Sequence, residues 1–147
     1  MKLWHNGILT NNIEQTIAFL CAADDYPIEK WKIMGEVEFS SENMHVGDGG
    51  KLRIAMGRVG DAVVELLQPL DETSYHAKVL KSRGPGFHHN AYICEDNQDE
   101  VIDRLLLQGG RIVWEFRKEG ERAVYVEAAD GSAVFEIINI CPFMPED

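Results

Sequence analysis

The chain has 147 residues, of which 45% are hydrophobic and 9% aromatic, which suits one domain with a buried core. Its formal net charge of −11 comes without a large Lys/Arg cluster, so we expect no nucleic acid partner. No apolar run approaches the ~20 residues of a membrane span and no signal peptide is recognisable, so we expect a cytoplasmic protein with no membrane partner.

The first half of the chain predicts a strand, a helix and three further strands. Asn11 or Asn12 can cap the helix, and Ile13, Ile17 and Leu20 form its single apolar stripe. Alternating and continuous apolar runs bounded by turn residues predict the strands that follow. These strands are expected at about 31–40, 51–58 and 61–68.

The second half predicts the same order of elements after a connecting helix. That helix should run from about Glu72 to Ser82 and end at Gly84-Pro85-Gly86, because neither proline nor glycine continues a helix. A further helix should begin at Asp96 or Asn97 and end at the Gly109-Gly110 pair. Strands are expected at about 111–117, 122–128 and 132–140.

The two halves also repeat each other residue by residue. Gly60-Asp61-Ala62-Val63-Val64-Glu65-Leu66-Leu67 recurs as Gly131-Ser132-Ala133-Val134-Phe135-Glu136-Ile137-Ile138, and His5-Asn6-Gly7-Ile8-Leu9 recurs as His89-Asn90-Ala91-Tyr92-Ile93. The chain is therefore expected to be an α+β protein with two tandem βαβββ modules. We place these modules at about 1–70 and 85–142, joined by a helix at about 71–84, within a single domain spanning residues 1–147. The extra residues of the first module fall mainly between 40 and 50, where the composition predicts a mobile loop.

A metal site is predicted from four residues at repeat-equivalent positions: His5, Glu65, His89 and Glu136. Each glutamate lies in a strand that is otherwise apolar, and a buried carboxylate needs a cation, a hydrogen-bonding partner or water. A lone strand histidine or glutamate is usually not a ligand, but the shared register favours a common cause. Two histidines and two carboxylates suit zinc, nickel, cobalt, manganese or iron, and an octahedral ion would keep two positions for substrate or water. His88 is the second choice, because a regular strand would turn it to the opposite sheet face.

The other chemically notable residues receive plainer interpretations. The basic residues Lys78, Lys81 and Arg83 are expected to form a solvated helix face rather than an anion site. His45 and His76 are interpreted as surface residues. The cysteines, which lack metal or redox spacing, are expected to be buried reduced thiols. They are Cys21, Cys94 and Cys141.

These features resemble the vicinal oxygen chelate (glyoxalase/bleomycin resistance/dioxygenase) superfamily over nearly the whole chain. The middle of the sequence resembles methylmalonyl-CoA epimerases in the segments Glu65–Ser74, Ala77–Leu80 and Gly86–Tyr92. The resemblance implies a curved mixed sheet around one divalent metal ion, with the family's ligands at His5, Glu65 (often Gln in the epimerases), His89 and Glu136. The ligand set also resembles that of bacterial glyoxalase I.

One departure concerns the second catalytic carboxylate. The epimerases place a glutamate early in the third strand, where this chain reads Gly50-Lys51-Leu52-Arg53. Either Glu36 or Glu38 takes the role of that glutamate, or the reaction differs from an epimerisation that uses two bases. The plainer alternative is that both residues simply face solvent. Arg53 is a candidate for binding a substrate carboxylate, because a guanidinium suits bidentate pairing.

The resemblance therefore implies a metal-dependent isomerase, epimerase or lyase. It would act through a metal-stabilised enolate on a small acyl-thioester or carbonyl substrate, with Glu136 as both ligand and base and Glu38 and Arg53 as further catalytic candidates. The alternatives are a glyoxalase I-like lactoylglutathione lyase, an extradiol-type dioxygenase and a non-enzymatic small-molecule-binding protein. A homodimer is expected from the superfamily.

Overall fold

The computed structural model describes residues 1–23 and 26–146. In the first half these residues form strands β1 (Lys2–Leu9), β2 (Lys32–Phe39), β3 (Met44–Val46), β4 (Gly50–Val59) and β5 (Ala62–Pro69), helix α1 (Ile13–Cys21) and the short 3-10 helices η1 (Ile28–Lys30) and η2 (Ser41–Asn43). The connecting helix α2 (Tyr75–Arg83) leads to β6 (Gly86–Ile93), α3 (Gln98–Leu107), β7 (Arg111–Lys118), β8 (Glu121–Glu127) and β9 (Val134–Ile138). The predicted α+β class and the repeated βαβββ order are confirmed.

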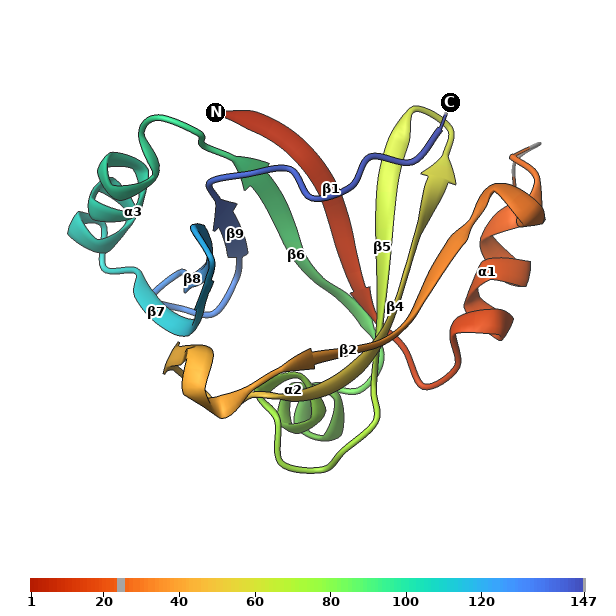
Figure 1. The fold of residues 1–147 in the computed structure, drawn as a ribbon, viewed down its shortest axis with the longest axis horizontal. Coiled ribbons are helices and arrows are strands. Elements are labelled where there is room, and N and C mark those ends of the chain that lie inside the picture. The colour runs from red at the N-terminus through yellow and green to blue at the C-terminus, as the bar shows by residue number, and fades with distance from the viewer. Residues whose placement is uncertain (24–25, 147) are drawn as a thin grey trace.

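All strands of the described residues join one mixed sheet in the order β2-β4-β5-β1-β6-β9-β8-β7-β3. The antiparallel pair β1–β6 lies at its centre, and each half pairs its first strand in parallel with its last, β1 with β5 and β6 with β9. The sheet curls strongly, as Figure 1 shows, and the strand order on one side of its centre repeats that on the other. The concave face is therefore built from equivalent strands of the two halves, which meet at the β1–β6 pair.

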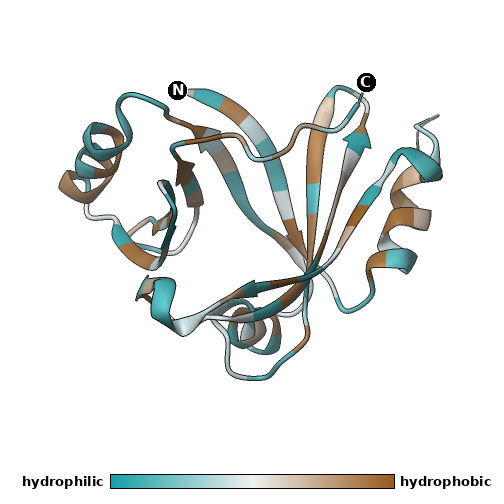
Figure 2. Ribbon diagram, viewed as in Figure 1, coloured by the Kyte–Doolittle hydropathy of each residue, from teal (hydrophilic) through white to brown (hydrophobic). Residues whose placement is uncertain are grey.

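The helices α1 and α3 cover the outer face of the sheet (Figure 1). Asn12 caps α1 by accepting a hydrogen bond from the backbone N–H of Gln15 at 2.9 Å, and Ile13 and Ile17 pack against Leu66 of β5. The next residue of β5, Leu67, packs on the other face of the sheet. Figure 2 shows a hydrophilic interruption within the otherwise hydrophobic β5. Both faces of this strand are covered, as the sequence predicted, and its polar residue must be compensated from within the protein.

The prediction of a mobile loop between residues 40 and 50 is wrong. The segment contains η2 and the strand β3, which pairs with β7 through Met44 opposite Phe116 and Val46 opposite Glu115. A window of sequence that is rich in turn residues does not reveal this pairing, because the partner strand lies about seventy residues away.

The cysteines differ in their exposure. All three are free thiols, as predicted, but only Cys94 is buried; Cys21 is half-buried and Cys141 is exposed. The prediction that all three are buried was therefore right for Cys94 alone; it was wrong for the half-buried Cys21 and for Cys141, which follows the last strand in a segment without regular structure.

The helices are too short or too polar to cross a membrane anywhere in the part of the chain that the structure describes.

Candidate metal centre

Four adjacent strands at the centre of the sheet supply the predicted ligands. Glu65 comes from β5, His5 from β1, His89 from β6 and Glu136 from β9, and the potential ligand atoms of all four lie within 4.8 Å of one another. All four residues are buried, with relative exposures between 0% and 8%. The structure thus brings together the residues that the sequence singled out, and their role as ligands remains a prediction.

The strand register explains how the four side chains meet. In one row across the sheet, Gly7 lies opposite both Glu65 and His89. In the equivalent row, Ala91 lies opposite both His5 and Glu136. Each row therefore places a small residue between a histidine and a glutamate, which leaves room for an imidazole ring to lean over the neighbouring strand.

Gly7 is needed because the ring of His89 lies directly against its backbone. A Cβ atom at this position would come within 2.1 to 2.6 Å of three atoms of that ring. Such contacts are far closer than any van der Waals separation, so a larger residue here would displace the ring.

The distances within the cluster match those around one metal ion. The Nε2 atoms of His5 and His89 lie 3.2 Å apart, and the four distances from these atoms to Oε1 of Glu65 or Glu136 range from 3.2 to 3.6 Å. Donors bound tetrahedrally at about 2.0–2.2 Å would be separated by roughly 3.3–3.6 Å. The donor set and its spacing therefore fit a divalent ion.

The electrostatics of the cluster favour a cation. Burial lowers the pKa of His5, but the neighbouring carboxylates of Glu65 and Glu136 outweigh this effect and raise the pKa to about 10. Burial alone would raise the pKa of Glu136, but hydrogen bonds from His5 and His89 lower it by more, so the net shift of this pKa is downward. The carboxylate of Glu136 thus prefers to be ionised next to positive charge, which a proton on a histidine or a divalent ion can supply.

His88 corrects one expectation from the sequence. A regular strand would turn it away from the cluster, but the pairing of β1 with β6 shifts register between Gly7 and Ile8, which lie opposite His89 and Phe87. His88 is the additional residue of this bulge, and it is buried with its Nδ1 atom 2.8 Å from Nδ1 of His89. Its Nε2 atom lies 2.9 Å from the hydroxyl of Tyr75.

These contacts hold the ring of His89, one of the candidate ligands, in a single orientation. If Nε2 of His89 binds a metal, its proton must reside on Nδ1 and be donated to Nδ1 of His88, whose own proton on Nε2 is then donated to Tyr75. Burial, followed by the charges of His89 and His76, lowers the pKa of His88 to about 2, which keeps this ring neutral and able to accept. By contrast, Nδ1 of His5 has no hydrogen-bond partner among the described residues.

His76 was interpreted as a surface residue, and this was wrong. It is 2% exposed, and its Nε2 atom lies 2.9 Å from the hydroxyl of Tyr125, which is opposite Glu136 in the register of β8 with β9. Burial, with a smaller contribution from the charge of His89, lowers the pKa of His76 to about 3, so the pair is neutral. Helix α2 carries too few apolar residues to indicate from sequence that one of its faces is buried.

A cavity of about 580 Å³ opens beside the cluster on the concave face of the sheet, and Glu65 and Glu136 line it. Among the predicted catalytic residues, Glu38 also lines this cavity, but its side chain is exposed. Sequence reasoning missed Glu121, a half-buried carboxylate of β8 that lines the same cavity. Burial, followed by the charge of Glu136, raises the pKa of Glu121 and favours its protonated form.

Arg53 does not lie where a substrate-binding role would need it. Its guanidinium pairs with Glu14 of α1 and donates to the side-chain oxygen of Gln68 at 3.4 Å, on the outer face of the sheet. The alternation of β4 turns Leu52 and Ile54 into the cavity and Arg53 away from it. The expectation that Arg53 binds a substrate carboxylate is therefore corrected.

The basic residues of α2 are exposed, as expected. Lys78 pairs with Asp48 at 2.5 Å and Arg83 with Glu127 at 3.1 Å. His45 is also exposed, in agreement with its interpretation as a surface residue.

Comparisons with known proteins agree with this geometry. Among solved structures, the chain is similar to methylmalonyl-CoA epimerase from Mycobacterium tuberculosis, with 25% identity, coverage of 96% of this chain and 89% of that chain, and a TM-score of 0.64. A methylmalonyl-CoA epimerase in complex with methylmalonyl-CoA is 21% identical over 99% and 98% of the two chains, with a TM-score of 0.61. A hypothetical protein from Bacillus halodurans is 23% identical over 99% and 98%, with a TM-score of 0.62. A comparison with curated proteins finds no match. Residues 4–126 match the glyoxalase/bleomycin resistance protein/dioxygenase superfamily, and the chain therefore belongs to this superfamily.

Proposed function

We propose that the protein is a metal-dependent isomerase, epimerase or lyase that acts through an enolate on a small carbonyl or acyl-thioester substrate. The observation that carries this proposal is the buried cluster of His5, Glu65, His89 and Glu136, whose two carboxylates face a cavity large enough for a small molecule. The likeness to methylmalonyl-CoA epimerases supports the same class of chemistry.

The four cluster residues would hold one divalent ion, of which zinc, nickel, cobalt, manganese and iron all suit the donor set. Bound there, such an ion would supply Lewis-acid polarisation of a substrate oxygen, which acidifies the adjacent C–H bond.

Glu136 is proposed to accept the proton from that carbon. Its carboxylate lines the cavity, and its lowered pKa keeps it ionised. Its Oε1 atom lies 3.4 and 3.5 Å from the two histidines, and an unused carboxylate oxygen is available to face the substrate. Proton removal breaks the C–H bond and leaves its electron pair on the substrate as an enolate.

Glu121 is proposed to return a proton to the substrate. It shares the cavity with Glu136, and burial raises its pKa, which makes Glu121 the more readily protonated of the two carboxylates. Glu38, the sequence-based candidate for this role, is the more exposed of the two and stays the alternative. An acid and a base with separated pKa values in one cavity are typical of enzymes that move protons at carbon.

The test is exchange of substrate hydrogen with heavy water. Protein loaded with one metal per chain would be mixed with a panel of acyl-CoA thioesters, including methylmalonyl-CoA, and 2-oxo acids, and deuterium incorporation followed by NMR. We expect exchange in the parent protein. The His89→Ala variant should lose both the exchange and the tight metal binding measured by calorimetry. The Glu121→Gln variant should keep the metal but turn over at least a hundredfold more slowly. Glu119→Gln, which removes an exposed carboxylate of the same hairpin, is the matched control. Exchange at the parental rate in metal-free protein would overturn the proposal.

A further inference from the structure

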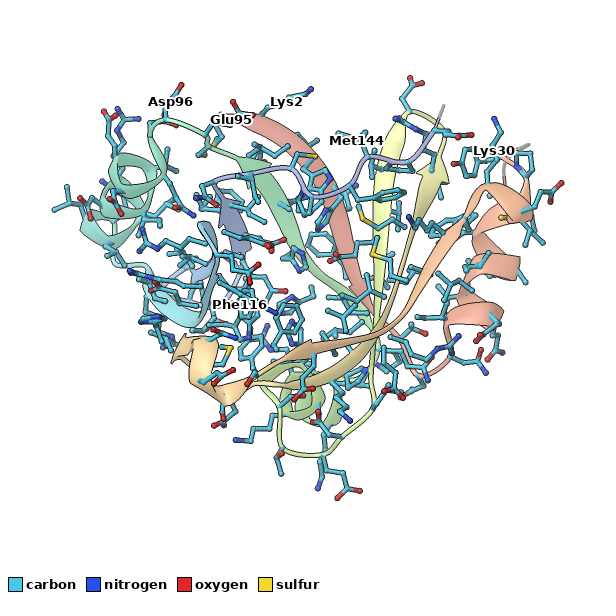
Figure 3. The ribbon with its side chains drawn as sticks, viewed as in Figure 1. Lys2, Lys30, Glu95, Asp96, Phe116 and Met144 are labelled. Carbon is cyan, nitrogen blue, oxygen red and sulfur yellow. The ribbon has the colours of Figure 1, made fainter. Side chains whose placement is uncertain are left out.

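The walls of the cavity are mainly aromatic and apolar. Trp4 of β1, Phe39 of β2, Trp114 and Phe116 of β7 and Phe143 near the C-terminus all contribute to them. The rings therefore come from both halves of the chain and surround the space from several sides. Figure 3 shows the side chains that fill the concave side of the sheet, with Phe116 labelled among them.

The aromatic residues hold one another in place. The ring of Phe39 meets those of Trp114 and Phe116 edge to face, with centroids 5.2 and 4.9 Å apart. Trp114 is stacked on Tyr125 at 4.6 Å. Such packing presents flat, rigid surfaces toward the cavity, and a flat ligand group can add one more ring to the cluster.

Charges on the lining oppose an anionic ligand group. Besides Glu65 and Glu136, the described residues add two more carboxylates to the lining, Glu38 and Glu121. Among the described residues the lining includes two cationic side chains: Lys32 lies over the ring of Phe143 at 4.9 Å, and Lys118 is exposed and opposite Glu121 in the β7–β8 ladder. The lining thus carries four carboxylates against two lysines, so a carboxylate on the substrate would meet net negative charge in this cavity.

The polar groups close to the cluster are also committed. Tyr125 and His76 bond to each other, and His88 is held between His89 and Tyr75. Next to the cluster a substrate thus meets mainly aromatic and aliphatic side chains, and a polar substituent there would lose hydration and gain few partners.

We infer that the substrate carries an uncharged aromatic or similarly flat apolar group next to the two oxygen atoms that bind at the cluster. This inference rests on the proposed metal centre and narrows its substrate class. It disfavours substrates whose acyl group carries a carboxylate. A cavity of about 580 Å³ is within the usual range for small-molecule sites.

Three hydroxamates that differ only beyond their chelating oxygens test this inference. Zinc-loaded protein, without excess zinc, would be titrated by calorimetry with acetohydroxamate, benzohydroxamate and 4-carboxybenzohydroxamate. We expect benzohydroxamate to bind at least tenfold more tightly than acetohydroxamate, and the carboxylate to remove most of that gain. Benzohydroxamate should also change tryptophan fluorescence, since Trp4 and Trp114 line the cavity.

The outcomes separate this inference from the proposed function. Equal binding of acetohydroxamate and benzohydroxamate, or tightest binding of the carboxylated compound, overturns the inference and leaves the metal centre intact. Failure to load zinc overturns both. Phe116→Leu should weaken benzohydroxamate binding severalfold and leave acetohydroxamate unchanged, whereas Phe19→Ala, on the exposed side of α1, should affect neither. The comparison of ligands on the parent protein stands even where a variant is unstable.

Discussion

Replacing His88 by phenylalanine tests whether the contacts behind His89 tune the metal centre. The substitution keeps a flat ring in a buried position but removes the Nδ1 atom that lies 2.8 Å from Nδ1 of His89. In the metal-free protein His89 can carry its proton on Nε2, facing the carboxylates, and needs no partner on Nδ1. In the metal-bound protein the proton must move to Nδ1, where the variant offers no acceptor.

The magnitude follows from this asymmetry. A buried donor without a partner costs about 1–3 kcal/mol, and here the cost falls on the metal-bound state alone. Since 1.4 kcal/mol corresponds to a factor of ten, metal affinity should fall roughly 10- to 100-fold, which agrees with the usual effect of losing a hydrogen-bond partner behind a ligand. The stability of the metal-free protein should change much less than this.

Competition of the protein with a fluorescent chelator for zinc would measure the affinity, and circular dichroism would confirm the fold of the metal-free variant. Tyr75→Phe removes the far end of the same chain of contacts, 2.9 Å from Nε2 of His88, and should have a smaller effect in the same direction. The reasoning fails if His88→Phe binds zinc within twofold of the parent, or if its metal-free melting temperature falls enough to account for the loss.

Further predictions follow from the geometry of the centre and from the turn before α2. Gly7→Ala should abolish stoichiometric metal binding while leaving a folded protein, because the new Cβ would come 2.1 Å from the ring of His89; bound zinc at the parental ratio would contradict this. Removing the metal with a chelator should lower the melting temperature, since a ligand at 100 times its Kd stabilises the native state by about 2.7 kcal/mol; an unchanged melting curve would argue against a site. Asp71→Ala should cost about 1–2 kcal/mol at neutral pH, because its carboxylate accepts from the backbone N–H groups of Lys51, Thr73 and Ser74 at 2.7 to 3.1 Å. Burial raises the pKa of Asp71, but these hydrogen bonds lower it below 3.8 overall, so this stabilisation is present above pH ~4 and is lost as the pH falls through the folded-state pKa. Urea unfolding of parent and variant at pH 7 and pH 2.5 would therefore show a gap that narrows in acid.

The internal repeat allowed both the fold and the four-residue cluster to be predicted from the sequence. Because Glu65 and Glu136 hold the same place in two copies of one strand, their apolar neighbours indicated burial, and the symmetry of the sheet brought the copies together. Local patterns also located Asn12 at the start of α1 and Asn97 at the start of α3, whereas α2 begins at Tyr75, later than the predicted Glu72.

The remaining features depend on contacts that no local pattern records. His88 faces the cluster because a bulge breaks the strict alternation of the strand, and His76 is buried because its ring packs against Trp114 of β7 and Tyr125 of β8. Arg53 has its partner on α1, at Glu14, which its position in the strand alone does not reveal. Glu121 lines the cavity on the concave side of the curled sheet, and its sequence neighbours Glu119, Gly120 and Arg122 resemble an ordinary surface turn.

The pairing of β3 with β7 limits how far the two halves of the curled sheet can move apart on its concave side. Strand β2 ends at Phe39 on one edge of the sheet, and β3 begins at Met44 on the other edge, so a connection of only four residues crosses between them. A fully extended chain covers at most about 3.6 Å per residue, so this tether holds its two attachment points within roughly 18 Å. The two halves therefore cannot swing apart widely about the central β1–β6 pair. Movements that admit a substrate then fall to smaller elements, such as the C-terminal residues Pro142 and Phe143 that line the cavity. Cutting the connection between residues 40 and 43 should speed ligand dissociation without changing any residue of the cluster.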